Sequence, residues 1–157
     1  MHFTASGTRF MIGGIREDAV DQGMSEADFA SEDWVEVESL ISLGRLSGNW
    51  ETRDFVDPGD MWEGGSAFNI AYKAVRPAKS MQIAVVLNDA DAGQLALVAA
   101  EGVRHPFAFR IVLPTGAERL FLALVVGMED AFEESNSVLA MTFDLVLRSN
   151  LVRVSGA

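Results

Sequence analysis

The sequence predicts a mainly β domain of the α+β kind, a sandwich or barrel of about seven strands with one flanking α-helix. Three observations lead to this fold class. The last third contains three apolar segments with the two-residue period of strands, turn residues punctuate the earlier part, and a single segment has helical spacing. The length of 157 residues fits one domain, 1–157, and the 49% of apolar residues can fill a sizeable core.

The last third is a β-meander with strands expected at residues 107–113, 119–127 and 137–149, and with a Pro-Thr-Gly-Ala turn after the first. Successive side chains of a strand point to opposite faces. In the second strand both alternating sets are apolar, as Phe121 and Leu122 illustrate. Such a strand needs cover on both faces, which either a helix of the same chain or a neighbouring subunit provides.

Five earlier strands are expected, at residues 8–12, 34–41, 50–55, 68–75 and 81–87. Gly13-Gly14 is expected to end the first of them. In the second, Val35 and Val37 alternate with Glu36 and Glu38, so one face of this strand should be exposed to solvent.

Residues 90–101 are expected to form the single helix. Asn88 and Asp89 supply side chains of the type that caps a helix N-terminus, and Gly102 is placed to end the helix. The apolar face of this helix is expected to contain Leu95, Val98 and Ala99, with Asp91 at its beginning and Leu97 beside it.

Two connections lack strand periodicity. The acidic segment 15–33 is expected to be mostly loop, with one helical turn capped at Ser25. Residues 56–66 carry Asp-Pro-Gly and Gly-Gly turn signals and form a long loop. Met61 and Trp62 lie in this loop, and such large apolar side chains either fold back onto the domain or dock on a partner.

The net charge of −11 is concentrated in the first part of the chain. Residues 1–66 contain four basic and fourteen acidic residues, whereas the remainder contains eight basic and nine acidic residues. This balance excludes a nucleic-acid binder that neutralises phosphates with Lys and Arg. Ordinary solubility also explains an acidic surface. No apolar run is long enough to span a bilayer, and we expect no signal peptide.

The residue pattern does not predict an enzyme or a cofactor. His2 and His105 are the two histidines, and neither has an evident nucleophile partner. There is no cysteine for a thiolate metal site. The acidic pairs at residues 129–130 and 133–134 flank Ala-Phe and are typical of a solvated hairpin. Gly13-Gly14 and Gly64-Gly65 do not match a phosphate-binding loop.

The order of these segments resembles the tail tube proteins of long-tailed, noncontractile bacteriophages, of the phage lambda major tail protein type. The resemblance rests on WVEVESL and GRLSGNWETRDFVDPGD before a loop, the helix AGQLALVAAEG, the meander FAFRIVLPTGAERLFLALVVG, and the closing strand NSVLAMTFDLVLRSN. It covers most of residues 30–154. The acidic segment 15–33 is difficult to align, and the immunoglobulin-like C-terminal domain of the lambda protein is not expected here.

The resemblance implies a structural virion protein whose six copies form a ring, with rings stacked into a hollow tube through which DNA enters the host. It implies a flexible N-terminal arm at 1–7 and an inter-subunit loop at 56–66. The implied partners are other copies of the chain and the tape measure, tail terminator and tail-tip proteins. DNA would pass through the lumen without specific binding, and the tube would be assembled in the bacterial cytoplasm and reside in the virion tail.

Within this resemblance, two sets of residues are candidates for assembly roles. Glu36 and Glu38 are candidates for an acidic lumen wall, because they alternate on an exposed face. The candidates for ring stacking are Asp57, Asp60, Met61, Trp62, Glu63, Lys73, Arg76 and Lys79. The last three form a basic patch that would pair with the acidic N-terminal part of the next ring.

Two alternatives remain from the sequence. The ring proteins of type VI secretion systems and the tube proteins of contractile tails share the implied architecture. A small-ligand-binding β-barrel is the alternative from a different class, with a pocket lined by Trp34, Trp50, Trp62 and Tyr72. A tube subunit should form rings or polymers as its concentration rises, whereas a binding barrel should stay monomeric.

Overall fold

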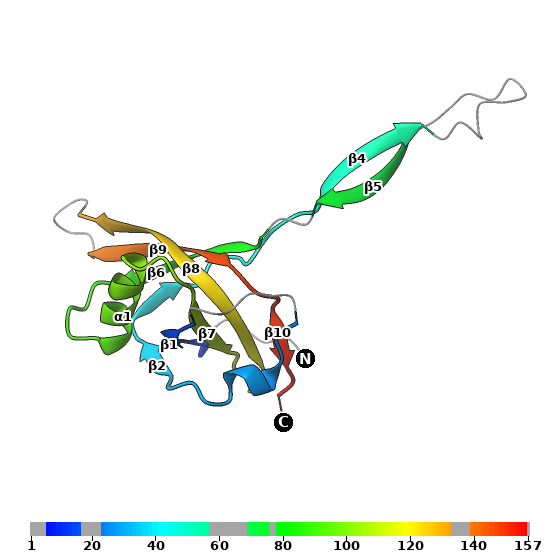
Figure 1. Ribbon diagram of the computed structural model, residues 1–157. Helices are drawn as coiled ribbons and strands as arrows, with labels where there is room; N and C mark the ends of the chain where they lie inside the picture. Colours follow the sequence, from blue (N-terminus) through cyan, green and yellow to red (C-terminus); the bar gives the residue numbers. More distant parts are fainter. Residues whose placement is uncertain (1–5, 17–22, 57–68, 76–77, 133–138, 157) are drawn as a thin grey trace, which may run out of the picture.

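The structure is a computed structural model that describes residues 6–16, 23–56, 69–75, 78–132 and 139–156 (Figure 1). It confirms the mainly β fold class with one α-helix. The elements are β1 (Arg9–Ile15), the 3-10 helix η1 (Glu26–Phe29), β2 (Val35–Val37), β3 (Leu40–Ser42), β4 (Glu51–Val56), β5 (Asn69–Val75), β6 (Ser80–Val86), α1 (Ala92–Glu101), β7 (Phe107–Val112), β8 (Glu118–Ala131), β9 (Ala140–Leu147) and β10 (Val152–Val154).

The main sheet is antiparallel and has the order β2-β1-β7-β8-β9-β6-β3, with β10 also paired to β8. Its two outermost strands, β2 and β3, are separated in the chain by Glu38 and Ser39 alone. The sheet must therefore curl until its two edges meet. The predicted single strand at 34–41 is wrong, because Ser39 has a φ of 60° and breaks it into β2 and β3.

Two buried side chains at the N-terminal end of α1 join the edges of the curled sheet. Asp91 Oδ2 accepts a hydrogen bond from the Glu38 amide (3.0 Å) and one from the Gln94 amide (3.1 Å), which makes Asp91 the helix N-cap. Gln94 Nε2 donates to the carbonyl oxygens of Glu38 (3.2 Å) and Val86 (2.9 Å). These bonds satisfy backbone groups that the break between β2 and β3 leaves without a strand partner.

The helix begins two residues later than predicted and buries a different face. Asn88, a predicted cap, accepts a hydrogen bond from the Ala90 amide, one turn before the helix. The buried residues of α1 are Gly93, Gln94, Leu97 and Ala100, whereas the predicted face residues Leu95 and Val98 are exposed. Asp91 and Gln94 must reach the sheet edges, so they decide which face of α1 is buried. Hydrophobic periodicity cannot predict such polar contacts.

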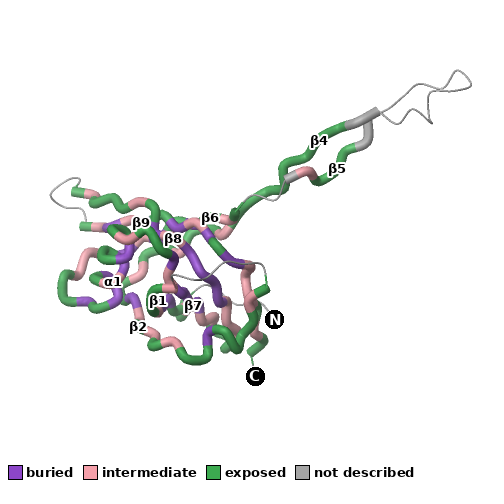
Figure 2. Tube along the Cα trace, in the orientation of Figure 1, coloured by how far each residue is buried: buried purple, intermediate pink, exposed green. Residues whose placement is uncertain are grey.

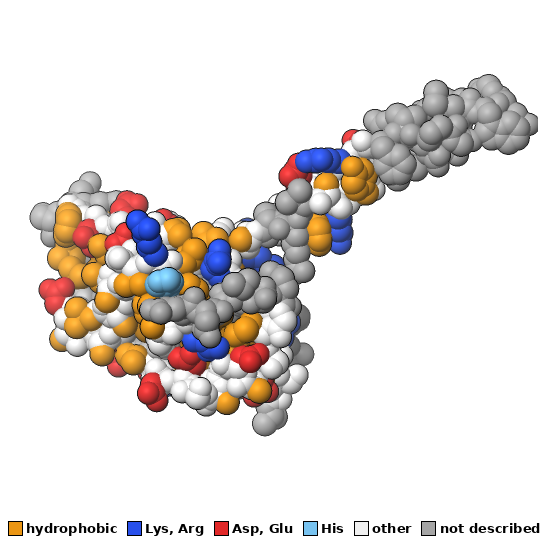
Figure 3. Space-filling model, in the orientation of Figure 1, with side chains coloured by type: hydrophobic (Ala, Val, Ile, Leu, Met, Phe, Trp, Pro, Cys, Tyr) orange, Lys and Arg blue, Asp and Glu red, His pale blue; other side chains and the backbone are white. Residues whose placement is uncertain are grey.

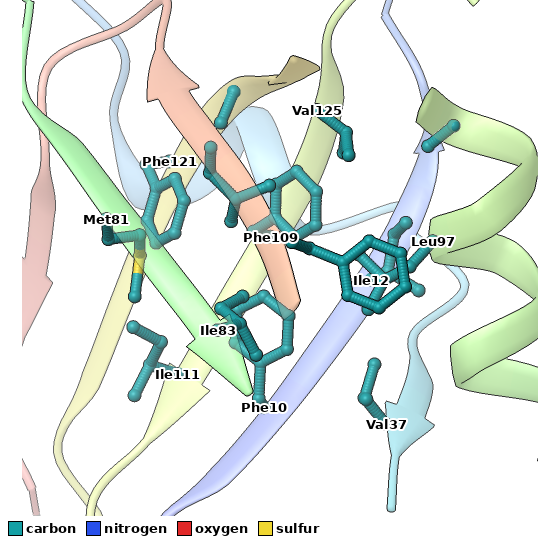
Figure 4. Close-up of a cluster of buried hydrophobic side chains, with 14 of the residues drawn as sticks. Phe10, Ile12, Val37, Met81, Ile83, Leu97, Phe109, Ile111, Phe121 and Val125 are labelled. Carbon is teal, nitrogen blue, oxygen red and sulfur yellow. The ribbon is translucent and has the colours of Figure 1, made fainter. Parts of the chain in front are cut away.

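The main core fills the concave side of the curled sheet (Figure 4). Phe10, Phe109 and Phe121 come from three neighbouring strands and stack with ring centroids 5.5 and 5.7 Å apart. Leu97 of α1 packs against the same cluster. The alternation predicted for the meander is confirmed, because Phe109 and Phe121 lie in this core.

The second face of β7 and of the first half of β8 is covered by the residues around η1. Figure 2 shows buried stretches along both strands. Phe29 of η1 packs on Ala108, Leu120 and Leu122, which are all buried. Asn150 holds this segment through two hydrogen bonds to the backbone of Met24. The chain thus covers the first half of β8 by itself.

Gly13-Gly14 does not end the first strand, contrary to the prediction. The pairing of β1 with β7 shifts register between Ile12 and Ile15, which indicates a bulge. Glu32 Oε2 accepts the Gly14 amide (2.8 Å), and a Cβ atom at Gly13 would lie 2.7 Å from the same oxygen. Arg16 Nη1 donates to Glu32 Oε1 (2.8 Å) and fixes the carboxylate.

The last strands also differ from the prediction. The expected strand at 137–149 is β9 alone, and β10 follows it along the same edge of β8. At the junction, Ser149 Oγ accepts the Leu122 amide (2.9 Å) where the strand pairing is interrupted. β8 extends to Ala131, beyond the predicted end at Gly127.

Substituting Gly93 tests how closely α1 must approach the sheet. A Cβ atom there would lie 2.3 Å from the Glu36 carbonyl oxygen and 2.6 Å from Val37 Cα, so Gly93→Ala should lower the free energy of unfolding by about 2–3 kcal/mol. Gly102→Ala is the matched control, because its Cβ would meet nothing nearer than 3.7 Å. Urea denaturation of both variants measures the difference, and equal stabilities would contradict the close contact.

Candidate assembly surfaces

Strands β4 and β5 form a separate two-stranded hairpin that projects from the body (Figure 1). Their register runs from Glu51 opposite Val75 to Val56 opposite Asn69. The hairpin side chains whose burial the structure describes are mostly exposed, including Tyr72. A two-stranded hairpin is at best marginally stable alone in water. An arm of this kind is suited to rest on another surface.

The predicted stacking residues fall at three places. Asp57, Asp60, Met61, Trp62, Glu63 and Arg76 lie outside the described residues. Lys73 lies on β5, with its ammonium nitrogen 5.4 Å from the centre of the Trp50 ring. Lys79 lies at the base of the hairpin and lines a groove on the body. Lys73 thus lies on the projecting hairpin, whereas Lys79 lies at its base on the body.

That groove lies at the end of the body where β6 and β8 begin. Three cations line it, Lys79, Arg119 and Arg153, together with apolar side chains that include Leu43, Leu113 and Leu151. Arg119 and Arg153 are direct partners in the pairing of β8 with β10. Like charges in that position destabilise a sheet. This cation cluster was not predicted from the sequence, because its members are far apart in the chain, at residues 79, 119 and 153.

The opposite end of β8 carries an acidic apolar tip. Among its residues, Phe132 is 70% exposed, Val126 54%, Leu139 48% and Met128 39%. Glu129 and Asp130 lie between them and are also exposed. Figure 3 shows acidic side chains next to hydrophobic ones at this end of the body. The pattern was predicted to be a solvated hairpin, and the exposed apolar residues were not anticipated.

The two lumen candidates differ in their surroundings. The Glu36 carboxylate forms an ion pair with Arg9 (Nε to Oε1, 2.7 Å). The hydrogen bond to Glu36, together with the Glu36 charge, raises the pKa of the Arg9 guanidinium above its ordinary value. Glu38 is exposed, and Asp91 and Gln94 bind its backbone. Among the described residues, Glu38 has no ion-pair partner.

The structure does not bring Trp34, Trp50 and Tyr72 together in one pocket. Trp34 packs on Phe29, with ring centres 6.5 Å apart, whereas Trp50 and Tyr72 lie on or beside the projecting hairpin. Trp62 lies outside the described residues. The described part of the chain contains no cluster of three acidic or histidine side chains placed to hold a metal ion. None of its helices is long and apolar enough to cross a membrane.

Comparisons with known proteins rest on structure alone, because neither a family profile nor a curated protein matches the sequence. A chain in the sheath/tube terminator structure of the PVC extracellular contractile injection system superposes with a TM-score of 0.65, at 8% identity, over 99% of this chain and 98% of that chain. A chain in the tail of an empty gene transfer agent particle, refined with C6 symmetry, superposes with a TM-score of 0.60 at 19% identity. The alignment covers 80% of this chain and 89% of that chain. For the SPP1 tail tube the TM-score is 0.50 at 12% identity, and the alignment covers 94% of this chain and 76% of that chain.

These identities are low, so the likeness is one of fold. The chain has the fold of tail tube and tube terminator proteins. The phage lambda type is not singled out among them.

The paired cations of the groove predict a measurable effect on the isolated subunit. Arg153→Ser should raise the free energy of unfolding by about 0.2–1 kcal/mol in low salt, because it removes repulsion from Arg119. The gain should disappear in high salt, which screens exposed charges. Arg104→Ser is the control, since this exposed cation follows the C-terminal end of α1, where positive charge is favourable. A gain of equal size in both variants would contradict the repulsion.

Proposed function

We propose that this protein is the subunit of a tail tube, in which rings of six copies stack into a hollow conduit for DNA. The observation that carries the proposal is the hairpin β4–β5, which forms a sheet of its own and projects from a body with the fold of tube proteins. A monomer gains little from such an arm, since the hairpin side chains whose burial the structure describes are mostly exposed. A neighbouring copy would supply the surface that the arm lacks.

The hairpin is also the element that would connect successive rings. Residues 57–68 connect β4 to β5 in the chain and lie outside the described residues. Their sequence contains Met61 and Trp62 among Asp57, Asp60 and Glu63. These residues remain our candidates for stacking, together with Lys73, Arg76 and Lys79. The tape measure, tail terminator and tail-tip proteins are the proposed partners at the tube ends.

An acidic lumen would let duplex DNA slide without adhering, because its phosphates are repelled by carboxylates. Six copies of a chain with net charge −11 supply that sign of charge to a ring. Glu38 is the stronger of the two lumen candidates, since Arg9 compensates the charge of Glu36. The particle would be assembled in the host cytoplasm, with the tube in the virion tail.

A tube terminator of a contractile injection system is the second candidate function. The observation in its favour is that the alignment with the chain from the PVC sheath/tube terminator structure covers 99% of this chain and 98% of that chain. A terminator would form one ring and stop, whereas a tube subunit would continue to add rings.

Electron microscopy across a concentration series, with mass determination by light scattering, tests both candidates. Hollow tubes that lengthen with concentration support the tube subunit. Single six-membered rings that do not lengthen support the terminator. A monomer at all concentrations, including in the presence of preformed tail tips, would overturn both.

Removing the hairpin should abolish tubes without unfolding the body. Ser47 and Ser80 exchange two backbone hydrogen bonds at the base of the arm (3.0 and 2.9 Å). Residues 49–78 can therefore be replaced by Asn-Gly, a dipeptide suited to a tight hairpin turn. We expect a folded subunit by circular dichroism and no tubes by electron microscopy. Tubes of normal length from this variant would show that the arm does not join rings.

Reversing the charge of Glu38 should make assembled tubes retain DNA. Glu38→Lys changes the formal charge of the proposed six-membered ring by twelve, and a cationic wall attracts phosphates. Short duplex DNA should co-sediment with these tubes in low salt and dissociate in high salt. Glu101→Lys, at the end of α1, is the matched control and should retain none. Equal retention by both variants would remove Glu38 from the lumen role.

A further inference from the structure

We propose that the acidic apolar tip of β8–β9 in one copy docks in the cationic apolar groove of another copy. The contact rests on the proposed stacking of copies and adds a second junction to the one made by the hairpin. The tip is defined by Val126, Met128, Glu129, Asp130, Phe132 and Leu139. The groove is defined by Lys79, Arg119 and Arg153 with Leu43, Leu113 and Leu151.

The groove has the properties of a site for an anionic, apolar segment. Lys79, Arg119 and Arg153 form no ion pair with any described residue. The nearest carboxylate in the sequence, that of Glu118, is already paired with Arg110. Arg119 Nη1 donates to the carbonyl oxygen of Glu118 (3.0 Å), but no described carboxylate offsets the repulsion between Arg119 and Arg153. An anionic partner would offset it.

The floor of the groove is continuous with the main core. Leu43, Leu113 and Leu151 are half-buried and pack against core residues, so part of their surface stays in contact with solvent. A partner with an exposed aromatic side chain would remove that surface from water. Burying a Phe side chain fully is worth about 1.5–3 kcal/mol.

The tip offers the complementary chemistry. Phe132 is the most exposed of the large apolar residues that the structure describes, at 70%. Glu129 and Asp130 precede it and are exposed. The groove thus combines positive charge with apolar surface, and the tip combines negative charge with apolar surface. Charges that are complementary in this way select the partner at an interface.

The geometry requires that the contact be between copies. β8 runs from Glu118, beside the groove, to Ala131, beside the tip. Over this length a strand spans roughly 40 Å, so the tip cannot reach the groove of its own subunit. Two different surfaces at opposite ends of one subunit give a head-to-tail contact, which propagates along an axis. Stacking of subunits along a tube is such a propagation.

Charge reversal on either side tests the contact. We expect the groove variant, Arg119→Glu with Arg153→Glu, to raise the concentration for half-maximal assembly at least about tenfold. The tip variant, Glu129→Arg with Asp130→Arg, should do the same. The control variant, Asp33→Arg with Glu101→Arg, makes the same charge change elsewhere and should assemble normally. Melting temperatures establish that each variant is folded.

Mixing the two defective variants is the decisive step. The reversed groove of one then matches the reversed tip of the other, and their unchanged surfaces still match. An equimolar mixture should assemble with alternating subunits at a concentration within about threefold of the unmodified protein. Unimpaired assembly of either variant alone, or no recovery in the mixture of two folded variants, would overturn the contact while leaving the tube proposal intact.

Crosslinking tests the same contact without requiring tubes. The chain has no cysteine, so Leu151→Cys with Phe132→Cys places one thiol in the groove and one at the tip. A bifunctional maleimide should produce a ladder of multimers from this double variant. Leu151→Cys with Ala27→Cys, an exposed site on η1, should not produce one. A ladder without tubes would support the contact and count against the tube proposal.

Residues 57–68 of another copy are the competing occupant of the groove, because their sequence also combines acidic residues with Met61 and Trp62. Leu151→Cys with Asp60→Cys distinguishes the two. A ladder from this pair, and none from the pair with Phe132→Cys, would overturn the proposed contact and assign the groove to the hairpin of a neighbouring copy.

Discussion

The hydrogen bonds of Asp91 and Gln94 hold together the two edges of the curled sheet, and the two ends of the body take their form from this junction. Both side chains are buried, and they bind the backbone of Glu38, where the sheet would otherwise remain open. A buried polar group without a partner costs about 1–3 kcal/mol. Each member of the junction therefore depends on the others, and Gly93 allows α1 to come close enough to form it.

The junction also makes the two ends of the body different. β6 begins at Ser80, next to Lys79 of the groove, and ends at Val86, whose carbonyl oxygen accepts a hydrogen bond from Gln94. The helix thus closes one end, next to the acidic tip, and the cationic groove remains at the other. A subunit with two unlike ends suits head-to-tail assembly, whereas identical ends would favour closed pairs. The net acidity of the chain hides this polarity, because the three cations of the groove are far apart in sequence.

The sequence predicted most of the strands and the core of the meander, since these depend on local alternation. Phe109 and Ile111 share one face of β7, as the two-residue period predicted, whereas in β8 the period predicted only that both faces are apolar. The sequence-based prediction was wrong where a long-range polar contact overrides the local hydrophobic pattern. Leu95 and Val98 have helical spacing yet are exposed, because Gln94 must face the sheet edges. Gly13-Gly14 looked like a strand end, but the carboxylate of Glu32 binds the Gly14 amide beside a bulge in the strand.

The assembly surfaces divide in the same way. By itself, the sequence determined the mainly β class, the single helix and the positions of β4 and β5, because residue periodicity and turn chemistry are local properties. Only the tertiary structure decided that these two strands leave the body, that Glu36 pairs with Arg9, and that Lys79, Arg119 and Arg153 share a groove. The reason is physical: strand pairing brings residues from distant parts of the chain together, and their charges interact only after the sheet has curled.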